Sequence, residues 1–275
     1  MNAIKGTFGM DKVLSEIILC TYNSQDFIVR CLDSILPQLS DQIHLQIIDD
    51  ASTDNTYSLI VSKINSFDRY VKVKHLQINQ GLTKNLNWYI ANSQAEYIFR
   101  MDADDIAVPN RFRYQLDYAL AHPNLDVIGG QALRIDSSGK VIGKTNKPLE
   151  NDRIIKKLYT NPFVHSTVLY RREAILKAGN YNVSHRYGQD YELWFRCAKY
   201  GLTMSNLSEV LVSYTVSPTS KYKISIYWNE FVVGLRGSIM VKLNLWCLIP
   251  LTSRFFLYSI KIATHHLKNV TPFKL

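Results

Sequence analysis

Two runs of acidic residues are the clearest candidates for chemistry in this chain. Asp102, Asp104 and Asp105 follow one short apolar stretch, and Asp49 and Asp50 follow another. Buried carboxylates are costly unless they are partnered or hold a cation, and Mg²⁺ and Mn²⁺ prefer oxygen ligands. The runs could therefore hold a divalent metal on a phosphate. Each run could instead serve only as a helix N-terminus, where acidic residues are favoured.

The elements around these runs predict that the runs lie close together. Apolar stretches alternate with segments of helical periodicity along the first half of the chain, at 17–20, 45–48, 57–67, 71–76, 82–91 and 97–101. This alternation is typical of a parallel sheet with crossover helices. Ligands of such sheets gather at the carboxyl ends of the strands. The polar clusters at 21–23, 49–55 and 102–105 follow strands, so we expect them to share one crevice.

The second half of the chain is less regular. A hairpin turn is expected at 137–140 and a strand at 210–214, while helical spacing returns at 172–178 and 190–200. Asp190 opens the last of these helices. Without further information, an N-terminal cap is its simplest role.

Composition indicates a folded chain with a basic tail. The 275 residues are 47% apolar, which is enough for one large domain with an appendage. The net charge is +9, and residues 221–275 hold eight Lys and Arg against one acid, Glu230. The four cysteines are widely spaced and predict neither a disulfide framework nor a zinc site, which favours a reducing compartment. Residues 1–13 contain no apolar run of signal-peptide length, so we expect a cytoplasmic protein.

The tail combines basic, aromatic and apolar residues. Residues 224–239 have helical spacing, and the longest uncharged stretch, Leu243 to Ser253, contains Pro250 and is shorter than the roughly 20 residues that span a bilayer. We expect peripheral contact with anionic lipid on the inner face of the cytoplasmic membrane. A helix packed back on the domain, or used in a dimer, is the alternative. The chain contains no recognisable nucleic-acid-binding motif, so nucleic acid is not expected as a partner.

Five motifs in order resemble those of glycosyltransferase family 2, whose members are inverting enzymes with the GT-A fold. They lie at 20–23, 49–54, 79–82, 102–105 and 189–194, and the resemblance covers roughly residues 15 to 215. The run at 102–105 is similar to the D-x-D motif of the family, and Gln189-Asp190 is similar to its Glu-Asp pair. No single motif is specific, but five in register identify the chain as a member.

The resemblance implies a fold and its division. We expect an α/β protein with a Rossmann-like, mostly parallel sheet flanked by helices. Its catalytic domain would cover 1–220, with a nucleotide-sugar half at about 13–105 and an acceptor half at 106–220. A basic amphipathic helical tail would follow at 221–275.

The resemblance also implies roles for residues. Those implied to bind the nucleotide-sugar donor are Thr21, Tyr22, Asn23, Asp50, Lys84, Asp102 and Ala103. Asp104, with Asp102, would hold Mn²⁺ or Mg²⁺ on the pyrophosphate, and Asp190 would take the proton of the acceptor hydroxyl. His165 and Gln189, with Arg113, are candidate acceptor-side groups. One base suffices, because a metal-bound diphosphate leaves without the proton that a hydrolase must supply from a second carboxyl group.

The chain departs from the family at three points. Gln189 stands where Glu is usual, and Thr215, Val216 and Ser217 follow the last strand where many relatives carry a histidine ligand. A Q-x-x-R-W motif is absent after Asp190, which predicts transfer of a single sugar rather than polymer synthesis. The expected acceptor is a glycan or lipid-linked glycan in bacterial surface-polysaccharide assembly, and the expected donor is a UDP-sugar.

Other classes fit less well. A haloacid-dehalogenase-type phosphatase would need Thr or Val where Ile106 stands, and a nucleotidyltransferase would need a Gly-rich loop after the first strand. The non-enzymatic alternative is an inactive glycosyltransferase-like binding or regulatory protein. Retention of Asp104 and Asp190 favours an enzyme.

Overall fold

The computed structural model describes residues 13–136, 138–216, 224–243, 249–250, 252–253 and 255–257. The predictions about the first 12 residues and about the end of the tail, including Lys261, Lys268, Lys274 and the His265-His266 pair, lie outside these ranges.

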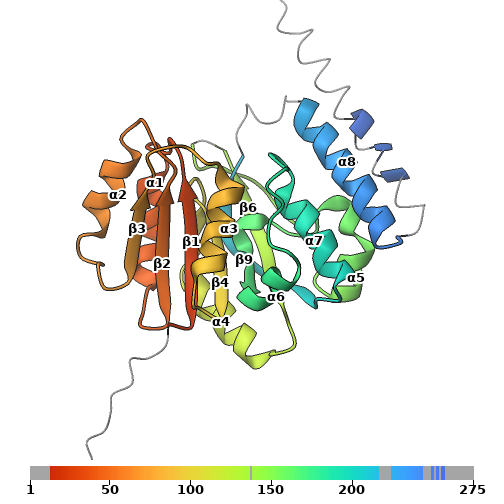
Figure 1. The fold of residues 1–275 in the computed structure, drawn as a ribbon, viewed down its shortest axis with the longest axis horizontal. Helices are drawn as coiled ribbons and strands as arrows, with labels where there is room; N and C mark the ends of the chain where they lie inside the picture. Colours follow the sequence, from red (N-terminus) through yellow and green to blue (C-terminus); the bar gives the residue numbers. More distant parts are fainter. Residues whose placement is uncertain are drawn as a thin grey trace, which may run out of the picture.

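One nine-stranded sheet runs through the molecule (Figure 1). Its strands are β1 (Ser15–Thr21), β2 (Ile43–Asp49), β3 (Val71–His75), β4 (Tyr97–Asp102), β5 (Ile106–Ala107), β6 (Val127–Ile135), β7 (Val141–Lys144), β8 (Leu169–Arg171) and β9 (Met204–Thr215). Their spatial order is β3-β2-β1-β4-β8-β6-β9-β5, with β7 paired to β6. The strands β3, β2, β1 and β4 are mutually parallel, and β6 is parallel to β9. The short strand β8 is antiparallel to both β4 and β6 and joins these two groups.

Helices cover both faces of this sheet (Figure 1). They are α1 (Ile28–Ile35), α2 (Thr56–Ile64), α3 (Leu82–Asn92), α4 (Arg111–Ala121), α5 (Asn151–Lys156), α6 (Arg172–Lys177), α7 (Gln189–Lys199) and α8 (Ile224–Met240). Side chains of a strand alternate between faces, so Ile17 and Leu19 of β1 pack in a core with α1, α2 and α4, whereas Ile18 packs with α3, α6 and α7. All three side chains are fully buried. The predicted α/β sheet with helices on both faces is confirmed.

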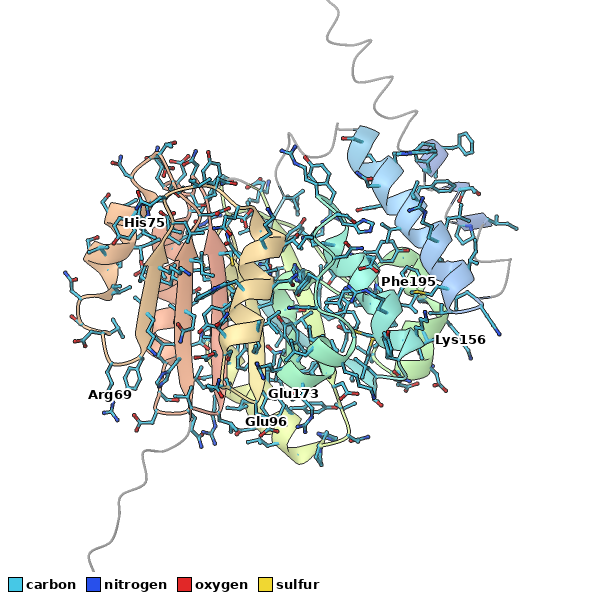
Figure 2. All side chains as sticks on the ribbon, viewed as in Figure 1. Arg69, His75, Glu96, Lys156, Glu173 and Phe195 are labelled. Carbon is cyan, nitrogen blue, oxygen red and sulfur yellow. The ribbon has the colours of Figure 1, made fainter. Side chains whose placement is uncertain are left out.

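The tail helix α8 packs against α7 and against a short 3-10 helix at Leu158–Thr160. Gly237 of α8 lies directly on the ring of Phe195, where an added Cβ would come within 2.3 Å of a ring carbon (Figure 2). Val233 of α8 is also buried. The sequence left open whether the tail forms a helix packed on the domain, and α8 adopts this arrangement. Within the described ranges, no helix has the length and apolar character needed to cross a membrane.

Candidate active site

The turns that follow β1 and β2 are bonded to each other. The backbone N–H of Asn23 donates to Ser52 Oγ at 3.0 Å, and the backbone N–H of Thr53 donates to Asn23 Oδ1 at 2.8 Å. Asn23 can do this because it adopts a positive φ of 49°, which asparagine tolerates. Tyr22 is left 48% exposed at this edge. The turn therefore presents the Tyr22 ring on a fixed backbone.

Asp50 fixes the loop before α3. Its Oδ1 accepts the backbone N–H of Gln80 and its Oδ2 accepts that of Gly81, both at 2.8 Å. Gly81 has a φ of 84°, a conformation that favours glycine. Each carboxylate oxygen of Asp50 retains a second lone pair. In the predicted contact, an N–H group of the nucleobase would donate a hydrogen bond to one of these lone pairs.

Asp49, on the other face of β2, also fixes neighbouring loops through hydrogen bonds. This fully buried carboxylate pairs with Ser52 Oγ and with His75 Nδ1, the latter at 2.6 Å. His75 lies at the carboxyl end of β3 (Figure 2). Asp49 thus joins the ends of β2 and β3 to the turn that holds Asn23.

Asp102 is an engaged carboxylate. Its Oδ1 pairs with Arg100, a buried arginine on the same face of β4, and its Oδ2 accepts the Ser166 hydroxyl at 2.7 Å. Although burial opposes ionisation, the Arg100 guanidinium holds the pKa of Asp102 below its usual value. Asp102 is therefore ionised and fixed in orientation.

Asp105 is fully buried and connects the acidic run to β9. It accepts the backbone N–H of Thr215 at 3.0 Å and also pairs with the Ser166 hydroxyl. Burial, together with Asp102 and Asp104, raises the pKa of Asp105 well above the usual value. We therefore interpret Asp105 as a structural residue that holds the acidic run against β9.

Asp104 has the least engaged carboxylate of the run. Its backbone carbonyl accepts Arg30 at 3.0 Å and the Thr215 hydroxyl at 2.6 Å, which fixes the main chain. Among the described residues its carboxylate has no hydrogen bond or ion pair to another side chain. Burial and the neighbouring Asp102 raise the pKa of Asp104 to about 6. A fixed carboxylate with unused oxygens beside an ionised one is chemically suited to a divalent cation.

The described residues contain no group of three or more His, Cys, Asp and Glu arranged to hold a metal by side chains alone. Tyr214 lies near the acidic run and directly precedes Thr215, where the sequence departs from the many relatives that carry a histidine ligand. Burial and the charges of Asp105, Asp102 and Asp104 raise the pKa of its hydroxyl to about 12. A cation at Asp102 and Asp104 would therefore take further oxygen ligands from water or from the substrate.

Asp190 lies in the first turn of α7, after Gly188, which caps the helix with a φ of 69°. Its Oδ2 accepts the amide N–H of Asn161 at 3.2 Å. Nearby, His165 shares a hydrogen bond of 2.8 Å with the Tyr181 hydroxyl. Burial and Arg100 lower the pKa of His165 to about 4, while Asp190 and Asp102 both oppose this shift. His165 is thus neutral. Its neighbour Ser166 bonds Asp102, and the His165 ring centroid is 6.3 Å from that of Trp194, one turn after Asp190 on α7, so this segment lies between the acidic run and the helix of Asp190.

The other predicted residues occupy less constrained positions. Thr21 is buried with a hydroxyl that has no hydrogen-bond partner in the structure, Ala103 is buried between the two aspartates, and Lys84 is exposed in the first turn of α3. Gln189 is the first residue of α7 and is half-buried. Arg113 instead contacts Asp117 and Gln42 at the start of β2, the opposite end of the sheet. Arg113 is therefore excluded from the site.

Sequence reasoning missed Arg100 and a link between α3 and the acceptor side. The signal for Arg100 was present, because an arginine within the apolar stretch 97–101 and two residues before Asp102 must share its strand face. The link is formed by Asn87, whose Nδ2 donates to the Tyr181 carbonyl at 2.7 Å and whose Oδ1 accepts the Tyr181 N–H at 2.9 Å. No local pattern indicates that pairing.

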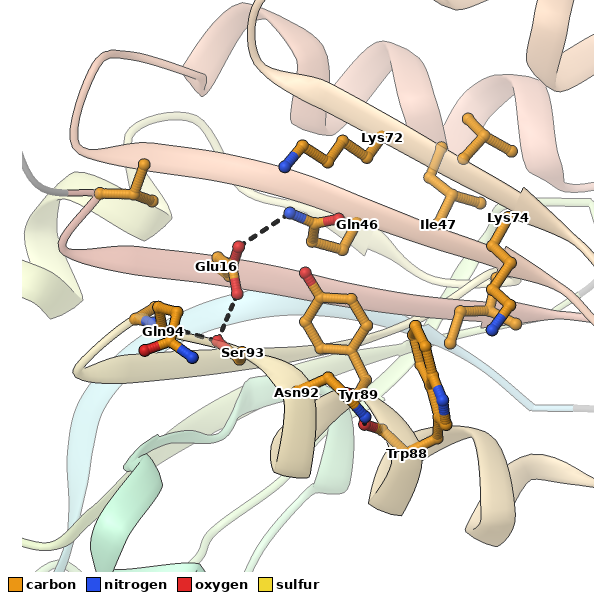
Figure 3. A pocket seen from close by; sticks show the side chains of 14 residues that line it. Glu16, Gln46, Ile47, Lys72, Lys74, Trp88, Tyr89, Asn92, Ser93 and Gln94 are labelled. Carbon is orange, nitrogen blue, oxygen red and sulfur yellow. Dashed lines mark hydrogen bonds between the residues drawn. The ribbon is translucent and has the colours of Figure 1, made fainter. Parts of the chain in front are cut away.

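A separate groove of about 520 Å³ lies between α3 and strands β1 to β3 (Figure 3). Lys72, Lys74 and Trp88 line it, and Glu16 on its floor accepts hydrogen bonds from Gln46 and Ser93. It includes none of the predicted site residues. The candidate site is therefore the polar edge described above and not this groove.

The chain is similar in sequence to known glycosyltransferases. The amylovoran biosynthesis glycosyltransferase AmsE of Erwinia amylovora is 30% identical over 200 residues, 72% of this chain and 74% of the relative. The UDP-Gal:alpha-D-GlcNAc-diphosphoundecaprenol beta-1,3-galactosyltransferase of Escherichia coli is 25% identical over 268 residues, 88% of this chain and 94% of the relative.

Two solved structures share the fold. One is S. aureus TarS 1-349 in complex with UDP-GlcNAc, with a TM-score of 0.64 and 18% identity over 89% of this chain and 81% of that one. The other is the mannosyltransferase PcManGT from Pyrobaculum calidifontis in complex with GDP-Man and Mn²⁺, with a TM-score of 0.64 and 17% identity over 94% of this chain and 81% of that one. The profile of the family described as "Glycosyl transferase family 2" matches residues 16–179, more than half of the chain. The fold and this match agree, and the chain belongs to glycosyl transferase family 2.

Proposed function

We propose that this glycosyltransferase transfers one sugar from a UDP-sugar to a hydroxyl of a lipid-linked glycan, in the cytoplasm, during assembly of a bacterial surface polysaccharide. Support comes from AmsE, named for amylovoran biosynthesis, and from the E. coli relative, whose name gives UDP-Gal as donor and a diphosphoundecaprenol acceptor. The observation that carries the proposal is that one short segment, His165–Thr167, reaches both sides of the site. Ser166 donates to Asp102 at 2.7 Å, and the His165 ring centroid lies 6.3 Å from that of Trp194, one helical turn after Asp190 on α7.

On the donor side, Tyr22, Asn23 and Asp50 would contact the nucleoside, and the exposed Lys84 would reach the phosphates. Support comes from their common position at the carboxyl edge of the sheet and from the hydrogen bonds that fix the loops around them. Fixed loops reduce the entropy lost when the donor binds.

Asp104, with Asp102, would hold Mn²⁺ or Mg²⁺ against the donor pyrophosphate. The donor atoms fit these ions, because the run offers only carboxylate oxygens and those of Asp104 are not used by other side chains. A structural neighbour was solved with GDP-Man and Mn²⁺. Such a cation supplies charge stabilisation to the departing diphosphate.

On the acceptor side, Asp190 would remove the proton of the attacking hydroxyl, with Asn161 holding its carboxylate in place. His165 and Gln189 would flank the acceptor. A single base opposite the leaving group gives direct displacement, so the anomeric configuration of the sugar is inverted.

The test is release of nucleoside diphosphate from a panel of UDP-, GDP- and dTDP-sugars, with Mn²⁺ or Mg²⁺ and with chelator. Asp190→Asn keeps the size and the N-terminal helix position but removes the base, so turnover is expected to fall about 10²–10⁴-fold while calorimetric donor binding persists. Asp104→Asn is expected to weaken metal-dependent donor binding as well. Asp117→Asn, at an exposed position on α4, is the matched control.

Donor binding without any effect of Asp190→Asn on turnover would remove Asp190 from the role of base. If no donor binds, the inactive binding-protein alternative becomes the better account. The configuration of the new linkage, read by NMR, tests inversion separately.

A further inference from the structure

The outer side of α8 and the segment after it expose large apolar side chains. Trp228 is 53% exposed, Ile239 68% and Phe256 63%. Trp228 and Phe231 of α8 lie against Phe255, with ring centroids 5.6 and 5.3 Å from that of Phe255. We refer to this area as the α8 surface, formed by Trp228, Phe231, Ile239, Phe255, Phe256 and Leu257. Aromatic rings grouped on an exposed face are typical of contact with a partner or a membrane interface.

Exposed cations border the α8 surface. Arg236 and Lys242 lie on and just after the C-terminal half of α8. Lys156 and Lys157, at the end of α5, directly precede the 3-10 helix that contacts α8, and Lys156 lies near the lower end of α8 in Figure 2. In the sequence, residues 221–275 hold eight Lys and Arg against Glu230 alone.

We propose that the α8 surface binds the face of an anionic lipid bilayer, with its aromatic rings in the interfacial layer and the bordering cations on lipid headgroups. The combination of aromatic rings with basic residues on a helix that does not span a membrane is the composition that interfacial helices use. A second copy of the chain is the less suitable partner, because pairing two such surfaces would bring like charges together.

This surface adjoins the acceptor side of the site. On its inner side α8 contacts α7 through Gly237 and Phe195, and Val233 lies beside Gly188, two residues before Asp190. A bilayer on the outer side of α8 would therefore be separated only by α8 from the helix that carries the proposed base. This proposal rests on the proposed function, in which the acceptor is lipid-linked. It adds which face of the protein lies against the membrane that holds the acceptor.

The experiment is co-sedimentation of the full chain with vesicles of equal parts phosphatidylglycerol and phosphatidylcholine, and with pure phosphatidylcholine. The wild type is expected to bind the anionic vesicles and to be released by salt. The double variant Trp228→Ser, Phe256→Ser is expected to weaken partitioning about tenfold or more, because two interfacial aromatic side chains are lost. Arg236→Glu with Lys242→Glu is expected to weaken it to a similar degree, on anionic vesicles only.

Trp88→Ser is the matched control, since Trp88 is 45% exposed but lies on α3, away from the α8 surface. Circular dichroism and donor hydrolysis in solution should be unchanged in the Trp228 and Phe256 variant, which separates this proposal from the enzymatic one. Equal binding of wild type and the Trp228 and Phe256 variant would overturn the proposal. The proposal would also be overturned if the wild type did not bind anionic vesicles. It would likewise be overturned if the wild type were a dimer that the Trp228 and Phe256 variant dissociates.

Discussion

At the scale of single residues, the two aspartates around Ala103 are in opposite electrostatic situations. Arg100 lowers the pKa of Asp102, whereas burial and Asp102 itself raise that of Asp104 to about 6. One carboxylate is thus neutralised by a buried arginine. The other forms no ion pair with a described residue, and the charges of Arg100 and Arg30 only partly offset its burial. Without a cation, an ionised Asp104 is a cost to the folded state.

This difference gives a pH-dependent prediction. The pKa of Asp104 is higher in the folded chain than the value of about 3.9 expected when unfolded. The folded state therefore holds the proton more tightly, and the stability that this gives is lost as the pH rises through about 6. In chelator, Asp104→Asn should melt about 2–4 °C above wild type at pH 8, with the difference vanishing near pH 4.

Asp26→Asn, at an exposed position, is the control and should leave the melting temperature unchanged at both values of pH. Thermal unfolding followed by circular dichroism is sufficient for the measurement. A lower melting temperature for Asp104→Asn at pH 8 would mean that the ionised carboxylate has a stabilising partner, contrary to the geometry.

The residues proposed for the chemistry could be named from the sequence, but the side chains that hold them in position could not. Asp104 and Asp190 belong to motifs of few residues in fixed order, which a linear pattern retains. The role of Ser166 could not be predicted, because its contact with Asp102 joins residues 64 positions apart. Such a pairing depends on the fold and leaves no mark on local spacing.

At the scale of elements, periodicity predicted the strands and helices that are long and buried. The expected helices at 82–91 and 190–200 correspond to α3 and α7 within a residue at each end. The strand β8 has only three residues, Leu169–Arg171, and its place between β4 and β6 follows from long-range antiparallel pairing. Its position could not be predicted, because no short segment carries its own register.

The Asn87 link between α3 and Tyr181 yields a prediction at this scale. Asn87→Ala removes both hydrogen bonds to the Tyr181 backbone. The Tyr181 carbonyl loses its partner, whereas the Tyr181 N–H keeps a bond of 3.1 Å to Asn180 Oδ1, so we expect a cost of about 1–2 kcal/mol in the free energy of unfolding. The hydroxyl of Tyr181 bonds His165, so its displacement disturbs the acceptor side. Once a donor is known, kcat should fall about tenfold with little change in donor KM.

The control is Asn92→Ala on the same helix, where an exposed asparagine bonds only the carbonyl of Trp88. It should alter neither urea unfolding nor kcat. A fall in stability for Asn87→Ala with unchanged kcat would assign the link to folding alone.

At the scale of the whole molecule, one sheet passes through both expected halves. Strands from either side of residue 105 pair in it, since β4 is joined to β6 through β8. The acidic run of β4 and the helix α7 that carries Asp190 are therefore positioned on a shared framework. Around this framework α8 is an added layer, attached mainly through α7 and the 3-10 helix at Leu158–Thr160.

The attachment of α8 can be weakened without touching the site or the α8 surface. At Gly237 an added methyl group would lie 2.3 Å from the ring of Phe195, which is fully buried. Gly237→Ala should therefore destabilise the protein by about 1–3 kcal/mol, although alanine favours a helix. Ser225→Ala, at an exposed position of α8, is the control and should be neutral or slightly stabilising.

Because α8 also contacts the N-terminal end of α7 through Val233 and Gly188, its displacement is expected to reach Asp190. Gly237→Ala should lower transfer to an acceptor more than it lowers donor hydrolysis by water, since water needs no acceptor alignment. Chemical unfolding and the ratio of the two rates give the measurement. A stable variant with an unchanged ratio would mean that α8 shifts freely on α7, and that the base is positioned by Asn161 and α7 alone.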